Sequence, residues 1–432
     1  MSQSMLFRNF APMLALTPII FFVCIYLGVS IILGDFYKVP IVIAFMLTAI
    51  VSIIVSKGTL KHRLKVFSRG GGSENIMLMI WIFIFAGAFA NSAKQMGSID
   101  DMVNLTLSLA PSDTIFAGLF LASAVISLSI GTSVGTIVAL MPIAIGLSQG
   151  IGASAPFAAA IVIGGAFFGD NLSFISDTTV CATQSQGCHM SDKFKTNIRI
   201  ALPAALLILF YYAFVGTSAA TPGSLPHANW LKITPYIIVL ITAMLGLNVL
   251  IVLTLGILLT GFVGLWYGDY TLETWFKAMA DGATGMGELI IVTMLAGGVL
   301  EVIRANGGIK FLMDKILRHV HSKRTAELSI ATLVSVVDIC TANNTVAIIT
   351  VSGIAKDISN RFKLDPRRVA SILDTFSCIM QGLIPYGAQM LMGAALAELN
   401  PLEIIPYLYY PYVLFIFAIG NILFRRNKNA TK

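Results

Sequence analysis

Long apolar stretches alternate with short polar segments along most of the chain. Membrane-spanning helices need about 20 mostly apolar residues, and five stretches match this pattern, at residues 11–33, 40–55, 76–93, 198–216 and 404–424. Residues 233–266 are too long for one span, and Leu247 and Asn248 predict a tight turn between two shorter ones. The pattern predicts a chain of helices that crosses a membrane repeatedly.

Three further apolar stretches carry polar breaks at or near their centres. The breaks are Gly131–Gly135 within residues 115–148, Gly169–Asn171 and Ser176–Thr179 within residues 155–181, and Thr341–Thr345 within residues 328–355. Non-helical backbone persists at membrane depth only where protein or a water-filled cavity satisfies its polar groups. We expect residues 115–148 and 328–355 to form re-entrant hairpins, the alternative being two ordinary kinked spans.

The two halves of the chain resemble each other weakly. Gly87 and the run 96–99 recur at one constant offset as Gly297 and the run 306–309, and the broken segment 169–179 corresponds to 380–389. Repeats that span a whole chain are common in secondary transporters. We predict an all-α polytopic membrane protein with two inverted-topology repeats, residues 1–217 and 218–432, that contain broken helices and re-entrant hairpins.

Charge predicts how the halves lie in the membrane. Residues 57–69 are rich in Lys and Arg, whereas the equivalent residues 269–281 are mainly acidic. The next pair of loops reverses this bias, since residues 94–113 are acidic and residues 304–324 are basic. Because Lys and Arg accumulate in cytoplasmic loops, equivalent loops lie on opposite sides, as inversion requires. The same rule predicts that both termini are cytoplasmic.

Composition agrees with this fold class. Hydrophobic residues make up 57% of the chain and charged residues 11%, whereas soluble domains are about 25% charged. These values exclude soluble, disordered, collagen-like and coiled-coil proteins. The net charge of +7 therefore bears on orientation and gives no reason to expect a nucleic-acid partner.

The break at residues 169–179 carries the richest chemistry. It offers two carboxylates, one amide and four hydroxyls, which are hard oxygen ligands suited to Na⁺, and an intramembrane carboxylate is a functional candidate by default. Competition between a cation and a proton for one carboxylate would give exchange, with Asp170 and Asp177 as the Na⁺-binding carboxylates. The alternative is a polar loop between two spans. The candidate cation- and proton-binding residues are Asp170, Asn171, Ser173, Ser176, Asp177 and Thr178.

The second half offers a smaller set of polar residues near its own break. Their amides and carboxylates could complete an ion site or bind a substrate carboxylate, although Asp338 and Asp374 also fit a purely structural contact between helices. These candidates are Asp338, Thr341, Asn343, Asn344 and Asp374.

Common catalytic motifs are absent from the sequence. We find no Walker motif, no Gly-x-Ser-x-Gly and no His-Glu-x-x-His. We therefore expect no enzyme activity and no cofactor, with Na⁺ and H⁺ present only as transported or coupling ions.

Residues 169–179 resemble the signature of the NhaC-type sodium/proton antiporter family, Gly-Asp-Asn-x-Ser-Pro-x-Ser-Asp-Thr-Thr. Phe174 replaces the usual proline, and Gly131–Ser133 and Asn343–Asn344 also look like that family. The resemblance implies inverted repeats, paired hairpins, often a homodimer, and secondary transport coupled to Na⁺ or H⁺.

The family also includes malate/lactate exchangers and proposed amino-acid transporters, so the resemblance leaves the substrate open. We predict that the protein lies in the lipid of the cell inner membrane and exchanges Na⁺ for H⁺ across it. The alternative is Na⁺- or H⁺-coupled transport of a small amino or organic acid.

Overall fold

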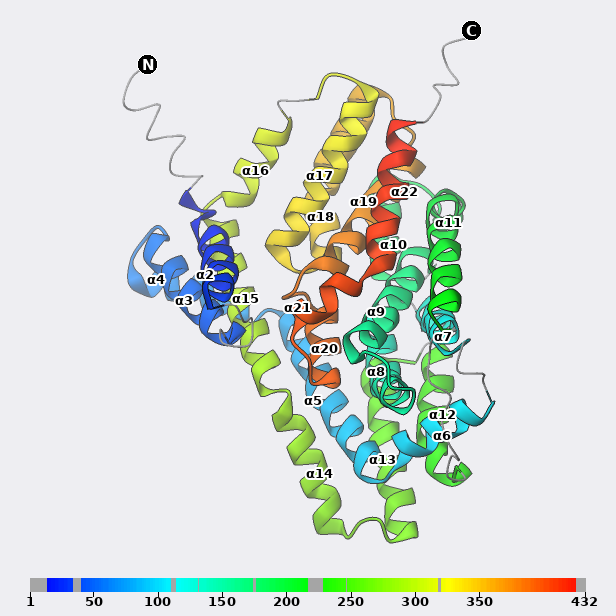
Figure 1. Cartoon of the computed structure of the whole chain (residues 1–432). Coiled ribbons are helices and arrows are strands. Elements are labelled where there is room, and N and C mark those ends of the chain that lie inside the picture. Colours follow the sequence, from blue (N-terminus) through cyan, green and yellow to red (C-terminus); the bar gives the residue numbers. More distant parts are fainter. Residues whose placement is uncertain are drawn as a thin grey trace.

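A computed structural model describes residues 14–33, 40–109, 114–130, 132–173, 176–216, 228–245, 247–317 and 320–424. Throughout these ranges the regular structure is helical, with no strand (Figure 1). Seven helices in these ranges are long and apolar enough to cross a membrane, or eight if one bent pair counts as a single span. The protein is an all-α polytopic membrane protein, as predicted.

Most uninterrupted apolar stretches form helices close to their predicted bounds, but the helix predicted at residues 198–216 begins earlier, at Met190. Asn248 begins the second helix of the predicted pair, where its side chain accepts a hydrogen bond from the Leu250 N–H at 2.9 Å. The last span bends by 53° after the short helices α21 (Pro401–Ile404) and η3 (Ile405–Tyr407). The helices are α2 (Thr17–Leu33), α3 (Ile41–Val55), α5 (Glu74–Gln95), α11 (Met190–Gly216), α12 (Trp230–Met244), α13 (Val249–Tyr267) and α22 (Tyr409–Leu423).

All four charged segments that we expected to be loops contain helices within their described residues. Basic residues lie on α4 (Leu60–Gly71) and acidic residues on α14 (Leu272–Gly285). Thr59 and Thr271 cap these helices by accepting backbone N–H groups, which satisfies donors that a helix start otherwise leaves free. α15 (Gly287–Ala305) follows α14, and the short helices α6 (Ser98–Leu109) and α16 (Gly308–Leu317) follow α5 and α15.

The interrupted stretches form pairs of helices. α7 (Ile115–Ile130) packs against α8 (Ser133–Gly150), and α17 (Lys323–Thr341) packs against α18 (Asn344–Phe362). In Figure 1 α17 and α18 lie in the upper half of the molecule and α8 lies in the lower half. Gly131 lies outside the described residues, and whether either pair is re-entrant in a bilayer stays a prediction.

Each half also contains a broken helix at the centre of the molecule. The first consists of α9 (Ala155–Leu172) and α10 (Asp177–Gln186), and the second of α19 (Pro366–Leu383) and α20 (Ala388–Ala397). The first break lies slightly later than predicted, because Gly169, Asp170 and Asn171 still belong to the last turn of α9. The most apolar windows of these two spans are 94% and 78% buried, so the breaks lie in the protein interior.

Equivalent helices of the two halves make equivalent contacts. α5 packs on α14 where Gly87 meets Gly282, and α4 packs on α15 where Gly70 meets Gly297. A Cβ atom on Gly87 would lie 2.2 Å from the Gly282 carbonyl oxygen, so these backbones touch directly. In Figure 1 α4 lies above α5, whereas α14 lies below α15. The two helix pairs thus run in opposite directions, as two inverted repeats require. The boundary between residues 217 and 218 stays a prediction.

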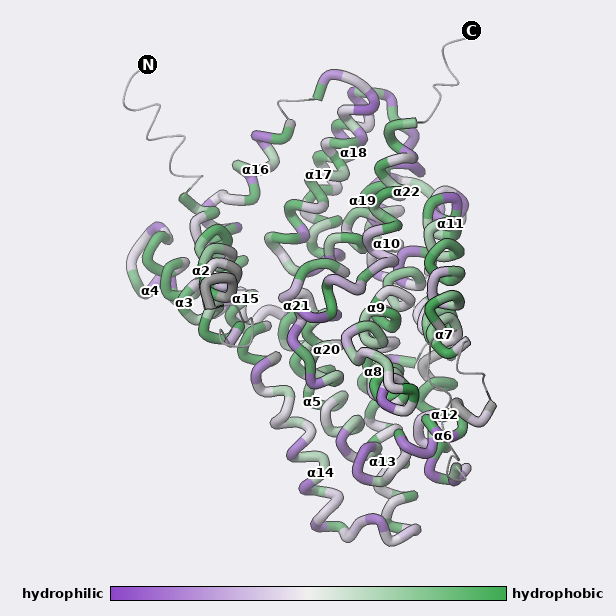
Figure 2. The backbone as a smooth tube through the Cα atoms, in the orientation of Figure 1, coloured by the Kyte–Doolittle hydropathy of each residue, from purple (hydrophilic) through white to green (hydrophobic). Residues whose placement is uncertain are grey.

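Figure 2 shows hydrophobic residues along most helices and hydrophilic residues gathered at the upper ends of α17 and α18. At that end, the Arg368 guanidinium pairs with both carboxylate oxygens of Glu327 and donates to Asn421, joining α17, α19 and α22. A cavity of about 510 Å³ separates α3, α14 and α15 from α20 and α21.

Candidate functional site

Asp170 lies where the first broken helix meets a hairpin of the same half. It is 5% exposed, and its Oδ2 accepts a hydrogen bond from the Ser133 hydroxyl at 3.0 Å. Ser133 is the first residue of α8, so the positive end of that helix dipole faces the carboxylate. Gly169 allows α9 to lie close to α7, because a Cβ atom there would be 2.4 Å from the Cβ of Ser127 on α7.

Hydroxyl groups hold the break between α9 and α10 in shape. The Ser176 hydroxyl donates to the Asp170 carbonyl at 2.9 Å, and its oxygen caps α10 by accepting the Thr179 N–H. The Thr179 hydroxyl donates to the Ser173 carbonyl at 2.8 Å. These bonds satisfy polar groups that a helix break would otherwise leave unpaired in the membrane interior.

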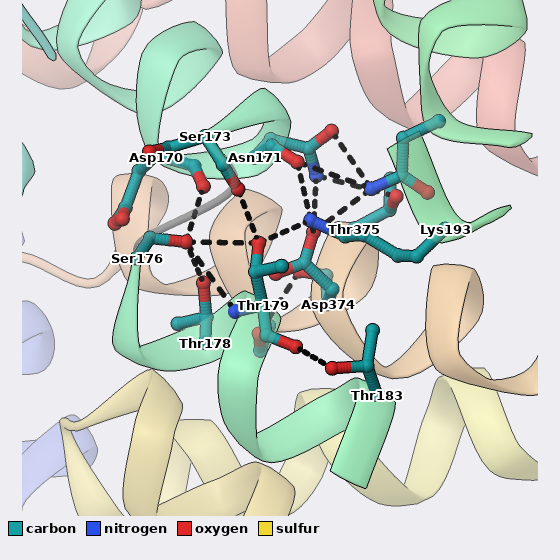
Figure 3. A network of polar contacts seen from close by, with 12 residues as sticks. Asp170, Asn171, Ser173, Ser176, Thr178, Thr179, Thr183, Lys193, Asp374 and Thr375 are labelled. Carbon is teal, nitrogen blue, oxygen red and sulfur yellow. Dashed lines mark hydrogen bonds and ion pairs between the residues drawn. The ribbon is translucent and has the colours of Figure 1, made fainter. Parts of the chain in front are cut away.

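A buried ion pair lies beside this break (Figure 3). The Lys193 ammonium on α11 is 2.7 Å from Oδ2 of Asp374 on α19, and the two side chains are 1% and 0% exposed. Lys193 also donates to the Asn171 carbonyl and to the Thr179 hydroxyl oxygen, both at 2.6 Å. All three ammonium donors are therefore used, each on an oxygen atom.

Two amides complete the surroundings of Asp374. Asn171 and Asn197 donate to its Oδ2 at 3.1 Å and 2.9 Å. Asn197 also donates to the Asn171 side-chain oxygen at 3.2 Å, and Asn171 donates to Thr375 at 3.2 Å. We call the set Asp170, Asn171, Thr179, Lys193, Asn197 and Asp374 the central network.

Amide side chains link the central network to the second hairpin. The Gln389 amide on α20 donates to the Ser133 hydroxyl oxygen at 3.1 Å, and the Gln381 amide donates to the Gln389 side-chain oxygen at 2.8 Å. Gln381 also donates to the carbonyl of Ala342, at the turn between α17 and α18, at 3.1 Å. A continuous chain of hydrogen bonds thus runs from Asp170 to the second hairpin.

The predicted site residues of the first half have different roles in the structure. Asp170 and Asn171 belong to the central network, Ser173 and Ser176 hold the break, and Thr178 lies beside Asp374. Asp177 is exposed at the first position of α10, although it lies close enough to Asp170 for the two charges to interact. Ser176 caps α10 and the Asp177 side chain points outward, and its role as a Na⁺-binding carboxylate stays a prediction.

The predicted site residues of the second half also differ, because only one of them belongs to the central network. Asp374 lies in the central network, whereas Asn343 caps α18 by accepting the Val346 N–H at 2.9 Å, and Thr341 donates to the Asn343 carbonyl at 3.2 Å. The Asn344 oxygen accepts the Thr345 N–H at 3.0 Å. Asp338 is buried on α17, and it contributes to none of these caps with its side chain.

Sequence reasoning missed Lys193 and Asn197. They lie in the charged run 191–199, which precedes an apolar stretch and looks like a loop. Their spacing of four residues was the available signal, because residues i and i+4 share one helix face. α11 begins at Met190, so this face turns toward the break.

The central network presents buried, preorganised oxygen atoms together with one internal cation. Asp170 and Asp374 supply carboxylates, Asn171 supplies a carbonyl, and Thr179 supplies a hydroxyl. Such oxygens suit a small monovalent cation. In the structure the Lys193 ammonium occupies three of them, at the meeting point of the two broken helices.

Comparisons with known proteins identify the family. The family model described as "Na+/H+ antiporter family" matches residues 3–217 and 227–425. The chain is 25% identical to the Na(+)/H(+) antiporter NhaC of Bacillus subtilis over 82% of this chain and 83% of that protein. It is 21% identical to the malate-2H(+)/Na(+)-lactate antiporter of the same organism over 84% and 85%.

A solved structure, the YdaH transporter of Alcanivorax borkumensis, shares 12% identity and covers 83% of this chain and 86% of its own, with a TM-score of 0.42. The family model covers nearly the whole chain, including every residue of the central network. This protein therefore belongs to the Na⁺/H⁺ antiporter family and is a transporter.

Proposed function

We propose that this protein exchanges Na⁺ for H⁺ across the cell inner membrane at the central network, with both termini cytoplasmic. The family, and relatives that carry the name Na⁺/H⁺ antiporter, support the two ions. The Lys- and Arg-rich segments near α4 and α16 support the orientation, since such residues favour the cytoplasmic side. Lipid would cover the exposed apolar side chains, and a homodimer is the assembly that the resemblance implies.

The observation that carries the proposal is the environment of Lys193. Its ammonium already occupies a buried site made of one carboxylate, one carbonyl and one hydroxyl oxygen. These are the ligand types that Na⁺ takes in proteins. Lys193 thus acts as a tethered monovalent cation, and Na⁺ binding at Asp374 and Asp170 would require it to move aside.

Charge balance then couples Na⁺ to the proton. Lys193 and Asp374 compensate each other, so with Asp170 protonated the central network is neutral, which is the state that a buried site tolerates. Na⁺ entry adds one positive charge to a low-dielectric region, where an uncompensated charge is costly. Loss of one proton from the same region restores the balance, so each ion favours departure of the other.

Transport of a small organic acid is the second candidate. The Asn344 side-chain nitrogen is buried and, among the residues that the structure describes, has no hydrogen-bond partner. An amide N–H of this kind could donate to a substrate carboxylate. The malate/lactate antiporter among the relatives makes this candidate worth testing in parallel.

Purified protein in liposomes with a trapped pH dye separates the two functions. Na⁺ added without any organic solute should change the internal pH, and Asp170→Asn or Asp374→Asn should reduce that rate at least tenfold. Asp357→Asn is the matched control, because Asp357 is exposed on α18 outside the central network. A pH change that requires malate, lactate or an amino acid would instead support the second candidate.

A further inference from the structure

Asp338 is a fully buried carboxyl group that has no role in the central network. It lies one turn before the end of α17, where its backbone carbonyl accepts the Ala342 N–H at 2.7 Å. The side chain lies near the backbone of Gln381 on α19, yet neither carboxyl oxygen forms a hydrogen bond within the described part of the chain. Its residue exposure is 0%.

The other buried acidic residues differ from Asp338 in this respect. Glu327 is paired with Arg368, Asp374 is paired with Lys193, and Asp170 accepts the Ser133 hydroxyl. Near Asp338, in contrast, no described cation lies close enough to interact appreciably with the carboxyl group. The titratable groups that face it are Cys340 on its own helix, Cys378 on α19 and Tyr386 in the following break, all neutral in their ordinary forms.

This environment favours the uncharged form of Asp338. An ionised carboxylate without a counter-ion or a donor is among the most costly groups to bury, and such groups take up a proton instead. A protonated carboxyl also supplies an O–H donor. The side-chain oxygen of Gln381 lacks such a donor, because it is buried and accepts no hydrogen bond from the described residues.

Gln381 also connects this region to the cation-binding carboxylates. Its amide nitrogen donates to Ala342 and to Gln389, and Gln389 donates to Ser133, which donates to Asp170. Reorientation of Ser133 around a cation at Asp170 would therefore change the hydrogen bonds of Gln381. Cys378 on α19 lies near both Asp338 and Asp374, so one helix borders the two regions.

We propose that Asp338 holds the exchanged proton, at a position separate from the Na⁺ ligands of the central network. This assignment rests on the proposed function and names its proton carrier. When Na⁺ binds at Asp170 and Asp374, the hydrogen bonds of Gln381 change through Ser133 and Gln389, the O–H bond of Asp338 breaks, and the proton passes to water. Release of Na⁺ reverses the step, and total charge is unchanged because one cation replaces another.

Proton release on Na⁺ binding tests the assignment directly. Purified protein in weakly buffered detergent, with a pH dye, should release about one proton per Na⁺ bound, and the Na⁺ Kd should change up to tenfold per pH unit. Asp338→Asn should still bind radioactive Na⁺ but release no proton, and its Kd should vary less than twofold per pH unit. Asp357→Asn should behave as wild type, whereas Asp170→Asn should lose Na⁺ binding and proton release together.

Three outcomes would overturn the assignment. Proton release at the wild-type level from Asp338→Asn would place the proton on another group. Loss of Na⁺ binding by a folded Asp338→Asn protein would make Asp338 a Na⁺ ligand. If that variant does not fold, Asp338→Glu keeps a carboxyl group and should still release a proton with a shifted pH midpoint, whereas an unchanged midpoint would contradict the proposal. A wild-type protein that binds no Na⁺ would instead refute the proposed function.

Discussion

The Lys193–Asp374 pair allows a quantitative test of the central network. Replacing one member, as in Lys193→Met, leaves the Asp374 carboxylate buried without its counter-ion, beside the Asn171 and Asn197 amides and the Thr178 hydroxyl. Breaking a buried pair from one side costs about 3–5 kcal/mol. The upper part of that range is expected here, because the substitution also removes donors from the Asn171 carbonyl and the Thr179 hydroxyl. Asp374→Asn should cost a similar amount, since it leaves the ammonium without its counter-ion.

The double variant Lys193→Met/Asp374→Asn should be far less destabilised than the sum of the single variants. Both charges are then gone, and replacing a whole buried ion pair is often close to neutral. Unfolding free energies can be measured by titrating the purified protein with a denaturing detergent and following helix content. Single effects that simply add in the double variant would mean that the pair does not interact as described. Ion exchange should be lost in all three variants.

Two further predictions follow from single residues. Asp177→Asn should raise the Na⁺ concentration for half-maximal exchange about threefold to fivefold without abolishing exchange. The effect is modest because Asp177 is exposed and acts on Asp170 only through its electrostatic field. Complete loss of exchange in the liposome assay would instead make Asp177 a main Na⁺ ligand. Gly87→Val should sharply reduce the yield of folded protein in size-exclusion chromatography, because its Cβ would lie 2.2 Å from the Gly282 carbonyl. Gly118→Ala is its control, since nothing lies within 4 Å of a Cβ there, and equal yields would contradict the close packing.

Much of the fold could be predicted because apolar length is a local property. The spans, the turn at Asn248 and the polar breaks are each visible within about 20 residues of sequence. The charged helices α4 and α14 were not predicted, since their polarity resembles that of a loop. Their starts at Thr59 and Thr271 depend on side-chain caps, which are weak signals in a sequence.

The candidate site was predictable only in part. Asp170 and Asp177 look alike in the sequence, and the cap at Ser176 decides which of them is buried. Lys193 faces the break because α11 starts at Met190, and its partner Asp374 comes from the other half of the chain. A single sequence contains no information about such a long-range pairing, so the internal cation could emerge only from the fold.

The glycine contacts between the halves restrict which parts of the transporter can shift during alternating access. Where Gly87 meets Gly282 and Gly70 meets Gly297, backbone touches backbone, and sliding would drive side chains of neighbouring turns into each other. These helices are therefore suited to remain a stationary frame. A cavity lies next to α20 instead, so the broken helices have room to be displaced while the frame stays in place.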